Sequence, residues 1–329
     1  MKFVQLSEKL NNEFFPLLYI YGEDAYLRSR AQQLVIQSLN IEYPEINLLT
    51  FEQGASYDEI ITACETVVFC SAKKAVVVKG TPPDLRGTGG AAGDKLPKSI
   101  QKVAKYIDDP YLDCCLIFND AKFCDYPLSK SIMAVDCNKL SREEVSKWVK
   151  ARVAHKKRTV SQAVATAVAD FCLLDMSRVY TETEKLLSYA AEGEEITLAD
   201  VNMLVNKDAE YVVYDLSNSI GAKDKGKTLN LLDQMLQSGQ KPKDLFRMLY
   251  RFYRRLFYVS ITKGEKNEIA ANLGVKEYAL TMSLNTAKLH TPVGLKKAMD
   301  IFYSYESRGA VGNIKGEELQ TLVLQLLNL

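Results

Sequence analysis

The stretch PLLYIYGEDAYL, residues 16–27, decides the fold of this 329-residue chain. Its first part, Pro16 to Ile20, is an apolar run with the length of a short buried strand, and the run breaks at Gly22. From Ala25 to Leu39 the apolar residues recur with helical spacing. This stretch therefore predicts a strand, a turn and a helix, which is the building unit of a parallel α/β sheet.

Further segments continue the alternation of strands and helices. Residues 46–51 and 75–78 predict strands, and the apolar run at 114–120 predicts a central strand that ends in Asn119 and Asp120. Ser56 and Glu59 have the spacing of a capping box at a helix start, and residues 98–107 have a helical pattern. Residues 80–97 are rich in glycine and proline, so we expect a long loop there.

Helical patterns dominate from Ser141 onward, where Ser141 and Glu144 predict another capping box. A break near residues 206–210 separates a small helical unit from a larger one. We therefore predict three domains: an α/β domain with a parallel sheet at 1–140, a small all-α domain at 141–210 and an all-α domain at 211–329.

The composition excludes several classes of protein. Lys and Arg number 42 against 41 Asp and Glu, whereas a dedicated nucleic-acid-binding protein is usually clearly basic. No apolar run approaches the length of a membrane span, so we expect neither export nor membrane insertion. The seven cysteines lack zinc-ligand spacing and are interpreted as reduced thiols in a cytoplasm. The only two histidines, His155 and His290, provide little material for a histidine-based metal site or a Ser-His-Asp triad. We expect no catalytic residue, no metal and no cofactor.

Residues 221–228, GAKDKGKT, match the phosphate-loop pattern G-x-x-x-x-G-K-[ST]. A phosphate loop needs a buried strand before it and the amino terminus of a helix after it. The apolar residues of 212–220 repeat with helical spacing instead, so Gly221 is predicted to cap a helix. We therefore favour an interhelical loop, with an NTPase that uses Lys227 and Thr228 as the alternative.

Residues 268–282 resemble a DNA-reading helix-turn-helix, with the tight turn at Gly274. The second helix, from Glu277 to Met282, has few side chains suited to base contacts. Two packed helices of a larger bundle are the favoured interpretation. A sequence-specific DNA-binding regulator is the second alternative.

A family resemblance extends over nearly the whole chain. Residues 17–27 resemble the opening of the delta-subunit family of the bacterial DNA polymerase III clamp loader. Residues 66–69, 73–74 and 76–79 are similar to the clamp-contact helix of that family and the strand after it. Residues 182–187 resemble its lid domain, and residues 245–256, 268–275 and 319–327 resemble helices of its collar. The resemblance implies a divergent AAA+ α/β domain, a small helical lid and a helical collar for oligomerisation.

The resemblance also implies a function without catalysis. Where an active AAA+ protein has Gly-Lys-Thr, this chain has Gly22, Glu23 and Asp24, whose two carboxylates would repel a nucleotide. Asn119 and Asp120 leave one carboxylate where a metal-binding acidic pair is usual. The chain is thus expected to bind and open the beta sliding clamp for loading onto primed DNA, without hydrolysing ATP itself.

The expected partners follow from the same resemblance. They are the beta sliding clamp, the gamma/tau and delta prime subunits of a hetero-pentameric loader, and primer-template DNA within that complex. The loader belongs to the DNA polymerase III holoenzyme, a nucleotidyltransferase complex of the cytoplasm. No membrane partner is expected.

The clamp-binding wedge of the family lies at the end of the helix that starts at Ser56. If this helix continues to residue 69, the apolar residues from Ile60 to Val68 share one face, and Phe69 lies about 140° from the centre of that face. We therefore expect Phe69 to be an exposed clamp anchor, with Val67 and Val68 as companions. In the alternative, Phe69 turns under the strand at 75–78 and joins the core.

Residues 245–258 predict an amphipathic collar helix. Its apolar face holds Leu245, Leu249, Phe252, Leu256 and Phe257. Arg247, Arg251, Arg254 and Arg255 lie largely off this face. Arg251 and Arg254 are the candidate DNA-proximal residues, and a solvated face is the alternative that we favour.

Overall fold

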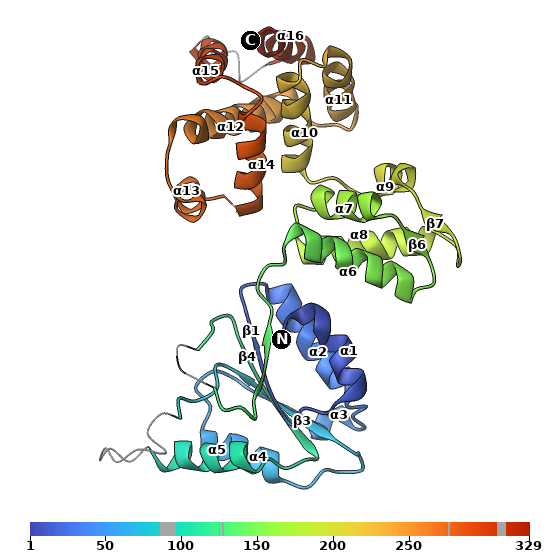
Figure 1. The fold of residues 1–329 in the computed structure, drawn as a ribbon, viewed down its shortest axis with the longest axis vertical. Coiled ribbons are helices and arrows are strands. Elements are labelled where there is room, and N and C mark those ends of the chain that lie inside the picture. The colour runs from blue at the N-terminus through green and yellow to red at the C-terminus, as the bar shows by residue number, and fades with distance from the viewer. Residues whose placement is uncertain (86–96, 125, 127, 276, 308–313) are drawn as a thin grey trace. The chain divides into compact units, whose positions relative to one another are not determined.

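The computed structural model describes residues 1–329 except 86–96, 125, 127, 276 and 308–313. Its contacts divide the chain into two compact units, Met1–Glu144 and Val145–Leu329. The first is an α/β unit and the second is mostly helical, as Figure 1 shows. The predicted fold class is confirmed, whereas the division into three domains stays a prediction. Most of the predicted loop at 80–97 lies outside the described residues.

The first unit contains a five-stranded parallel sheet with the strand order β2-β3-β4-β1-β5. The edge strand β5 was not expected from the sequence. The elements are η1 (Phe3–Gln5), α1 (Leu6–Asn12), β1 (Leu17–Tyr21), α2 (Ala25–Ser38), α3 (Pro44–Asn47), β2 (Leu48–Phe51), α4 (Tyr57–Glu65), β3 (Lys74–Lys79), α5 (Lys98–Asp108), β4 (Cys114–Asp120) and β5 (Met133–Asp136).

Helices cover both faces of this sheet (Figure 1). Leu17 and Tyr19 of β1 belong to one buried cluster with Ile60 of α4 and Ile107 of α5. Because side chains alternate along a strand, Leu18 points to the other face, which α1 and α2 cover. Burial on both faces explains why β1, β3 and β4 are continuous apolar runs.

Helix α4 differs from its prediction in two ways. Ser56 is its N-cap residue but makes no side-chain capping bond, so the predicted capping box is absent. The helix ends at Glu65, so Val67 and Val68 do not continue its buried face, and Val67 is 79% exposed. By contrast, the predicted capping box at Ser141 and Glu144 is confirmed, since each side chain accepts a hydrogen bond from the other residue's backbone N–H.

The second unit is built mainly from helices. Its one pair of strands among the described residues, β6 with β7, was not predicted. Among the residues that the structure describes, no helix has the length and apolar character needed to cross a membrane. The elements are α6 (Arg142–His155), β6 (Thr159–Val160), α7 (Gln162–Phe171), α8 (Met176–Tyr189), β7 (Glu195–Ile196), α9 (Leu198–Leu204), α10 (Ala209–Gly221), α11 (Lys225–Gln237), α12 (Pro242–Ile261), α13 (Lys266–Leu273), α14 (Glu277–Ala287), α15 (Pro292–Ser307) and α16 (Gly316–Leu327).

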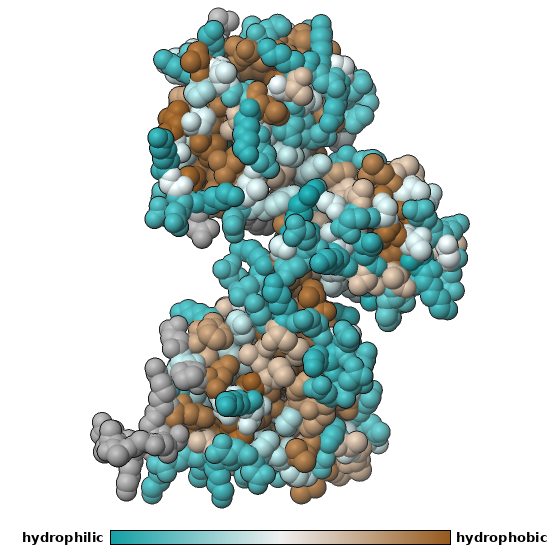
Figure 2. All heavy atoms as spheres, in the orientation of Figure 1, coloured by the Kyte–Doolittle hydropathy of each residue, from teal (hydrophilic) through white to brown (hydrophobic). Residues whose placement is uncertain are grey.

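Hydrophobic residues reach the surface of both units, where Figure 2 shows them interspersed with hydrophilic ones. In the first unit, several of the large exposed apolar side chains belong to segments that precede a strand of the sheet: Phe14, Tyr43, Ile46, Val67, Phe69 and Leu112. Because the strands are parallel, these segments all lie at the amino edge of the sheet. The opposite, carboxyl edge contains the exposed Phe123 together with polar residues such as Arg28, Gln32 and Lys79.

Candidate functional site

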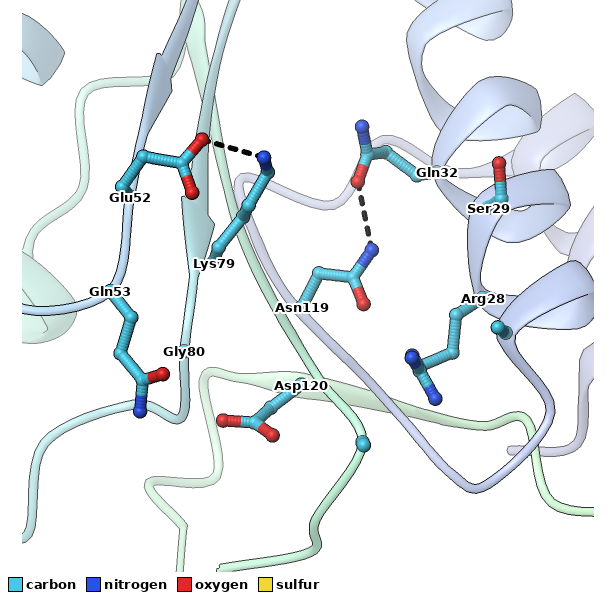
Figure 3. Close-up of a pocket in the computed structure, with 11 residues that line it drawn as sticks. Arg28, Ser29, Gln32, Glu52, Gln53, Lys79, Gly80, Asn119 and Asp120 are labelled. Carbon is cyan, nitrogen blue, oxygen red and sulfur yellow. Dashed lines mark hydrogen bonds and ion pairs between the residues drawn. The ribbon is translucent and has the colours of Figure 1, made fainter.

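The carboxyl edge of the sheet contains a polar hollow of about 440 Å³ (Figure 3). Arg28 and Gln32 of α2 point toward it, and Lys79 and Asn119 line it from the ends of β3 and β4. The Lys79 ammonium pairs with the Glu52 carboxylate at 2.6 Å, and the Asn119 amide donates to Gln32 at 2.8 Å. Several of its polar groups are thus already bonded to one another. This is the edge at which open α/β sheets usually bind ligands.

The turn between β1 and α2 forms hydrogen bonds within the protein where a nucleotide-binding turn would hold phosphate. The backbone N–H of Glu23 donates to the Asn138 side chain at 3.1 Å, and that of Asp24 donates to the Cys137 carbonyl at 3.2 Å. The Asp24 carboxylate caps α2 by accepting from the Leu27 N–H at 3.0 Å. These N–H groups are therefore not free to cradle an anion.

Gly22 is needed in this turn because the chain passes very close to it. Its φ is +137°, and a Cβ atom would lie 2.3 Å from the carbonyl carbon of Cys137. The neighbouring Glu23 carboxylate faces solvent and pairs with Lys139 at 2.9 Å. The turn is thus closed by the segment that follows β5.

The Asn119 and Asp120 pair shows no arrangement for a metal. Asn119 bonds Gln32, and Asp120 accepts a hydrogen bond from the Lys122 backbone N–H at 3.0 Å. Among the described residues, no cluster of three or more His, Cys, Asp or Glu side chains is arranged to bind a metal ion. Burial raises the pKa of the Cys137 thiol, beside this turn, to about 12, so it stays protonated near neutral pH.

At the amino edge, the segment after α4 projects two apolar side chains into solvent. Phe69 is 53% exposed, so the alternative that it joins the core under β3 is wrong. Val68 is half-buried beside it. The ring of Phe69 meets the ring of Tyr43 edge-on, with centroids 6.3 Å apart. Phe69 and Val67 are therefore available to a partner.

Hydrogen bonds hold this segment at both ends. The Lys74 ammonium is almost fully buried and donates to the carbonyls of Ala63 (2.7 Å) and Thr66, at the carboxyl end of α4. A cation is favourable at the carboxyl end of a helix, where the helix dipole is negative. Burial of the Lys74 ammonium lowers its pKa. At the other end, the Asn47 side chain bonds both the N–H and the carbonyl of Phe69. Residues 67–69 thus form a short projecting loop with fixed ends.

The phosphate-loop match at 221–228 connects two helices, α10 and α11, and no strand precedes it. Thr228 is fully buried and bonds Ser219, while the Lys227 ammonium pairs with Asp215 at 2.8 Å. The strand that presents a phosphate loop is missing here, which favours the interhelical loop over the NTPase alternative. Gly221 is the last residue of α10 and not its cap; a Cβ there would lie 2.9 Å from the His290 ring.

We expect Lys227→Ala to leave the ATP affinity of the chain nearly unchanged. The partly exposed Lys227 and Asp215 pair contributes at most about 1 kcal/mol to stability. Titration of the isolated chain with ATP checks this. A large loss of ATP affinity in a folded Lys227→Ala variant would show that the loop binds phosphate.

The helix-turn-helix match corresponds to α13 and α14, and Gly274 caps α13 with a φ of +62°. Lys276, within the match, lies outside the described residues. Helix α14 buries Leu280 and Met282 and packs against α12 and α10. The hydroxyl of Tyr278, also on α14, donates a hydrogen bond to the Asp170 carboxylate at 2.6 Å. This packing supports the predicted bundle over a DNA-reading helix.

The predicted collar helix is α12, and its apolar face is buried, with Phe257 only partly so. Arg251 and Arg254 are exposed, as expected for a solvated face. Arg255 differs from the prediction because it is largely buried, lying over the Phe252 ring at 5.1 Å and 3.9 Å from a Glu210 carboxylate oxygen. Arg255 therefore packs within the helical unit and does not belong to the exposed face of α12.

Sequence reasoning missed three residues beside the Phe69 loop: Tyr43, Ile46 and Asn47. Tyr43 and Ile46 are exposed, and Asn47 is 2% exposed. A signal was available, since Tyr43 and Pro44 precede the strand that pairs with β3. Segments that precede neighbouring parallel strands lie at the same edge of a sheet.

Comparisons with known proteins agree with this architecture. Residues 18–123 match the family model for the DNA polymerase III delta subunit, and residues 210–326 match the model for its C-terminal domain. The DNA polymerase III subunit delta of Bacillus subtilis is 24% identical over 304 residues, which cover 86% of this chain and 84% of the relative. A probable DNA polymerase III subunit delta of Aquifex aeolicus is 26% identical over 281 residues, covering 81% and 78%.

A solved structure, the DNA clamp loader delta protein of Bacillus subtilis, superposes with a TM-score of 0.73 at 20% identity. The superposition covers 99% of this chain and all of that one, and it shows that the two share a fold. The two family models together match more than half of the sequence. This chain therefore belongs to the DNA polymerase III delta subunit family.

Proposed function

We propose that this chain is the delta subunit of a clamp loader, and that it binds and opens the beta sliding clamp without hydrolysing ATP. The observation that carries the proposal is the exposed Phe69 on a loop whose ends are fixed, at the position that resembles the family's clamp contact. Val67 and Val68 are its proposed companions. An exposed aromatic side chain that enters a partner's pocket is an effective anchor.

Opening of the ring needs no chemistry in this subunit. Binding that favours the open clamp shifts an equilibrium between closed and open rings, and the shift is as large as the difference in affinity. The ends of the 67–69 loop are already bonded, so little conformational entropy is lost on docking. ATP then acts on the gamma/tau subunits, and the turn at Gly22, Glu23 and Asp24 has a structural role.

The helical part of the chain is proposed to hold this subunit in the clamp-loader complex. Residues 211–329 would form the collar that joins gamma/tau and delta prime in a cytoplasmic hetero-pentamer, with 141–210 as the lid. Burial of the apolar residues of α10, α12, α15 and α16 in one cluster supports a stable collar domain.

Capture on beads that carry the sliding clamp tests the proposal. The isolated chain should be retained without any nucleotide, and the retained fraction should not change when ATP is added. Tight ATP binding without clamp capture would favour an enzyme. Selective retention of one DNA duplex without clamp capture would favour a regulator.

Reversing the charges of Arg251 and Arg254 is expected to leave the rate of DNA-dependent clamp loading within about two-fold of the wild type. Both side chains are exposed, and solvated charges contribute little free energy to binding. The measurement is clamp loading on primed DNA by a loader that contains Arg251→Glu and Arg254→Glu. Loss of loading with normal subunit assembly would instead place these residues against DNA.

A further inference from the structure

A second segment, residues 42–47 before β2, lies beside the Phe69 loop and was not indicated by the sequence. Tyr43 and Ile46 are each 50% exposed, although both are large apolar residues. The Tyr43 ring lies edge-on to the Phe69 ring. The two exposed aromatic side chains are therefore neighbours although they are far apart in the sequence.

Asn47 joins the two segments. Its amide nitrogen donates to the Glu42 carbonyl at 2.7 Å and to the Phe69 carbonyl at 2.8 Å, and its oxygen accepts from the Phe69 N–H at 3.1 Å. Both donor hydrogens of the amide are thus used, one on each segment. Because Asn47 is buried, these bonds are shielded from competing water.

A second link supports the first. The Glu42 N–H donates to the Ser71 hydroxyl at 3.1 Å, and that hydroxyl donates to the Lys73 carbonyl at 2.8 Å. Tyr43 and Cys70 both have a left-handed backbone, with φ of +50° and +48°. Residues other than glycine adopt this conformation only where the surroundings enforce it. The hydrogen bonds of Asn47 and Ser71 are made with residues next to Tyr43 and Cys70 in the sequence.

From these contacts we infer that Tyr43 and Phe69 form one two-part anchor for the sliding clamp and that Asn47 is its positioning residue. The inference rests on the proposed clamp-binding function. Three exposed acidic residues stand next to the two segments in the sequence: Glu42 and Glu45 on either side of Tyr43, and Glu65 at the end of α4. The occupant of the anchor is therefore an apolar pocket of the clamp with a basic rim, and Glu45→Lys should weaken binding.

The test measures the affinity of full-length variants for the sliding clamp. The temperature is chosen from the melting curves so that every variant is folded. Tyr43→Ala should weaken binding about ten-fold, as for an interface aromatic. The control is Phe123→Ala, at an exposed aromatic residue of the same unit that follows β4, and it should bind like the wild type.

A double-mutant cycle separates positioning from general stability. Asn47→Ala should weaken clamp binding about ten-fold when it is made in the wild type. In a Tyr43→Ala/Phe69→Ala background the same substitution should weaken binding less than about two-fold, because the two rings that Asn47 positions are absent. Its effect on the melting temperature should be the same in both backgrounds. A purely structural Asn47 would lower the melting temperature without this coupling in affinity, which would overturn its role.

The outcomes also separate this inference from the proposed function. If Phe69→Ala weakens binding while Tyr43→Ala and folded Asn47→Ala bind like the wild type, the two-part anchor is wrong and the clamp contact stands. If Phe69→Ala itself has no effect, the proposed contact is wrong. Should Asn47→Ala fail to fold, Ser71→Ala removes the second link more mildly and should weaken binding by a few-fold. Unchanged affinity of both Ser71→Ala and Tyr43→Ala would then overturn the inference.

Discussion

Phe69→Ala should weaken binding of the isolated chain to the sliding clamp by about 2 kcal/mol or more, the range of an interface hot spot. This corresponds to an increase in Kd of about 30-fold. The melting temperature and loader assembly should remain nearly unchanged, because Phe69 is already 53% exposed. Equilibrium titration of the variant with labelled clamp measures the effect.

Phe123→Ala is the matched control for this substitution. Phe123 is 54% exposed, almost the same as Phe69 at 53%, and it also packs against a tyrosine, with its ring centroid 4.6 Å from that of Tyr21. Phe123 follows β4, so it lies at the carboxyl edge of the sheet. A variant Phe69→Ala that melts at a markedly lower temperature yet keeps its clamp affinity would show that Phe69 stabilises the fold and that the proposed clamp contact is wrong.

Gly22→Ala should lower the free energy of unfolding by about 4 kcal/mol or more, as expected where a buried backbone must be displaced. A Cβ atom at Gly22 would lie 2.3 Å from the Cys137 carbonyl carbon and 2.4 Å from the Asn138 nitrogen. Moving the Cys137 segment would also weaken the hydrogen bonds to Asp24 and Tyr21. Urea denaturation followed by circular dichroism measures the loss.

Substitutions at two other glycines show whether backbone strain or the steric clash causes the loss of stability in Gly22→Ala. Gly54 also has a positive φ, +90°, but nothing lies within 4 Å of a Cβ added there, so Gly54→Ala measures the backbone cost, about 1 kcal/mol. Gly80 has neither constraint, and Gly80→Ala should be nearly neutral. If Gly22→Ala costs no more than Gly54→Ala, the close approach of the Cys137 segment does not determine the residue at position 22.

The sheet could be predicted from the sequence because its central strands are buried on both faces. The runs at 17–20, 75–78 and 114–118 are apolar for that reason, and helices such as α2, α4 and α5 lie between them. Strand β5 has a weaker pattern, since only Val135 of its residues is fully buried. The strands β6 and β7 have two residues each, too few for any periodicity.

The candidate site could be predicted only in part. The apolar character of Val67 and Phe69 was visible in the sequence, but the end of α4 at Glu65 was not. That end depends on hydrogen bonds from Lys74 to the carbonyls of Ala63 and Thr66, which residue spacing does not reveal. In the same way, the link from Asn47 to Phe69 joins segments 22 residues apart and exists only in the folded chain.

The nucleotide-site prediction had a chemical basis that the sequence does show. Glu23 and Asp24 stand where a cation would be needed, and their charge follows from residue type alone. The sequence did not reveal that the Asn138 side chain and the Cys137 carbonyl bond the N–H groups of this turn. Those residues come from the segment after β5, a strand that was not predicted.

We propose that this subunit opens the sliding clamp by binding alone. The most direct measurement is the release of clamps preloaded on circular nicked DNA, followed after addition of the isolated chain without nucleotide. We predict release at a rate that rises with the concentration of the chain, is unchanged by ATP and is strongly reduced for Phe69→Ala. Tight binding to the clamp with no release, or release that requires ATP, would contradict the claim.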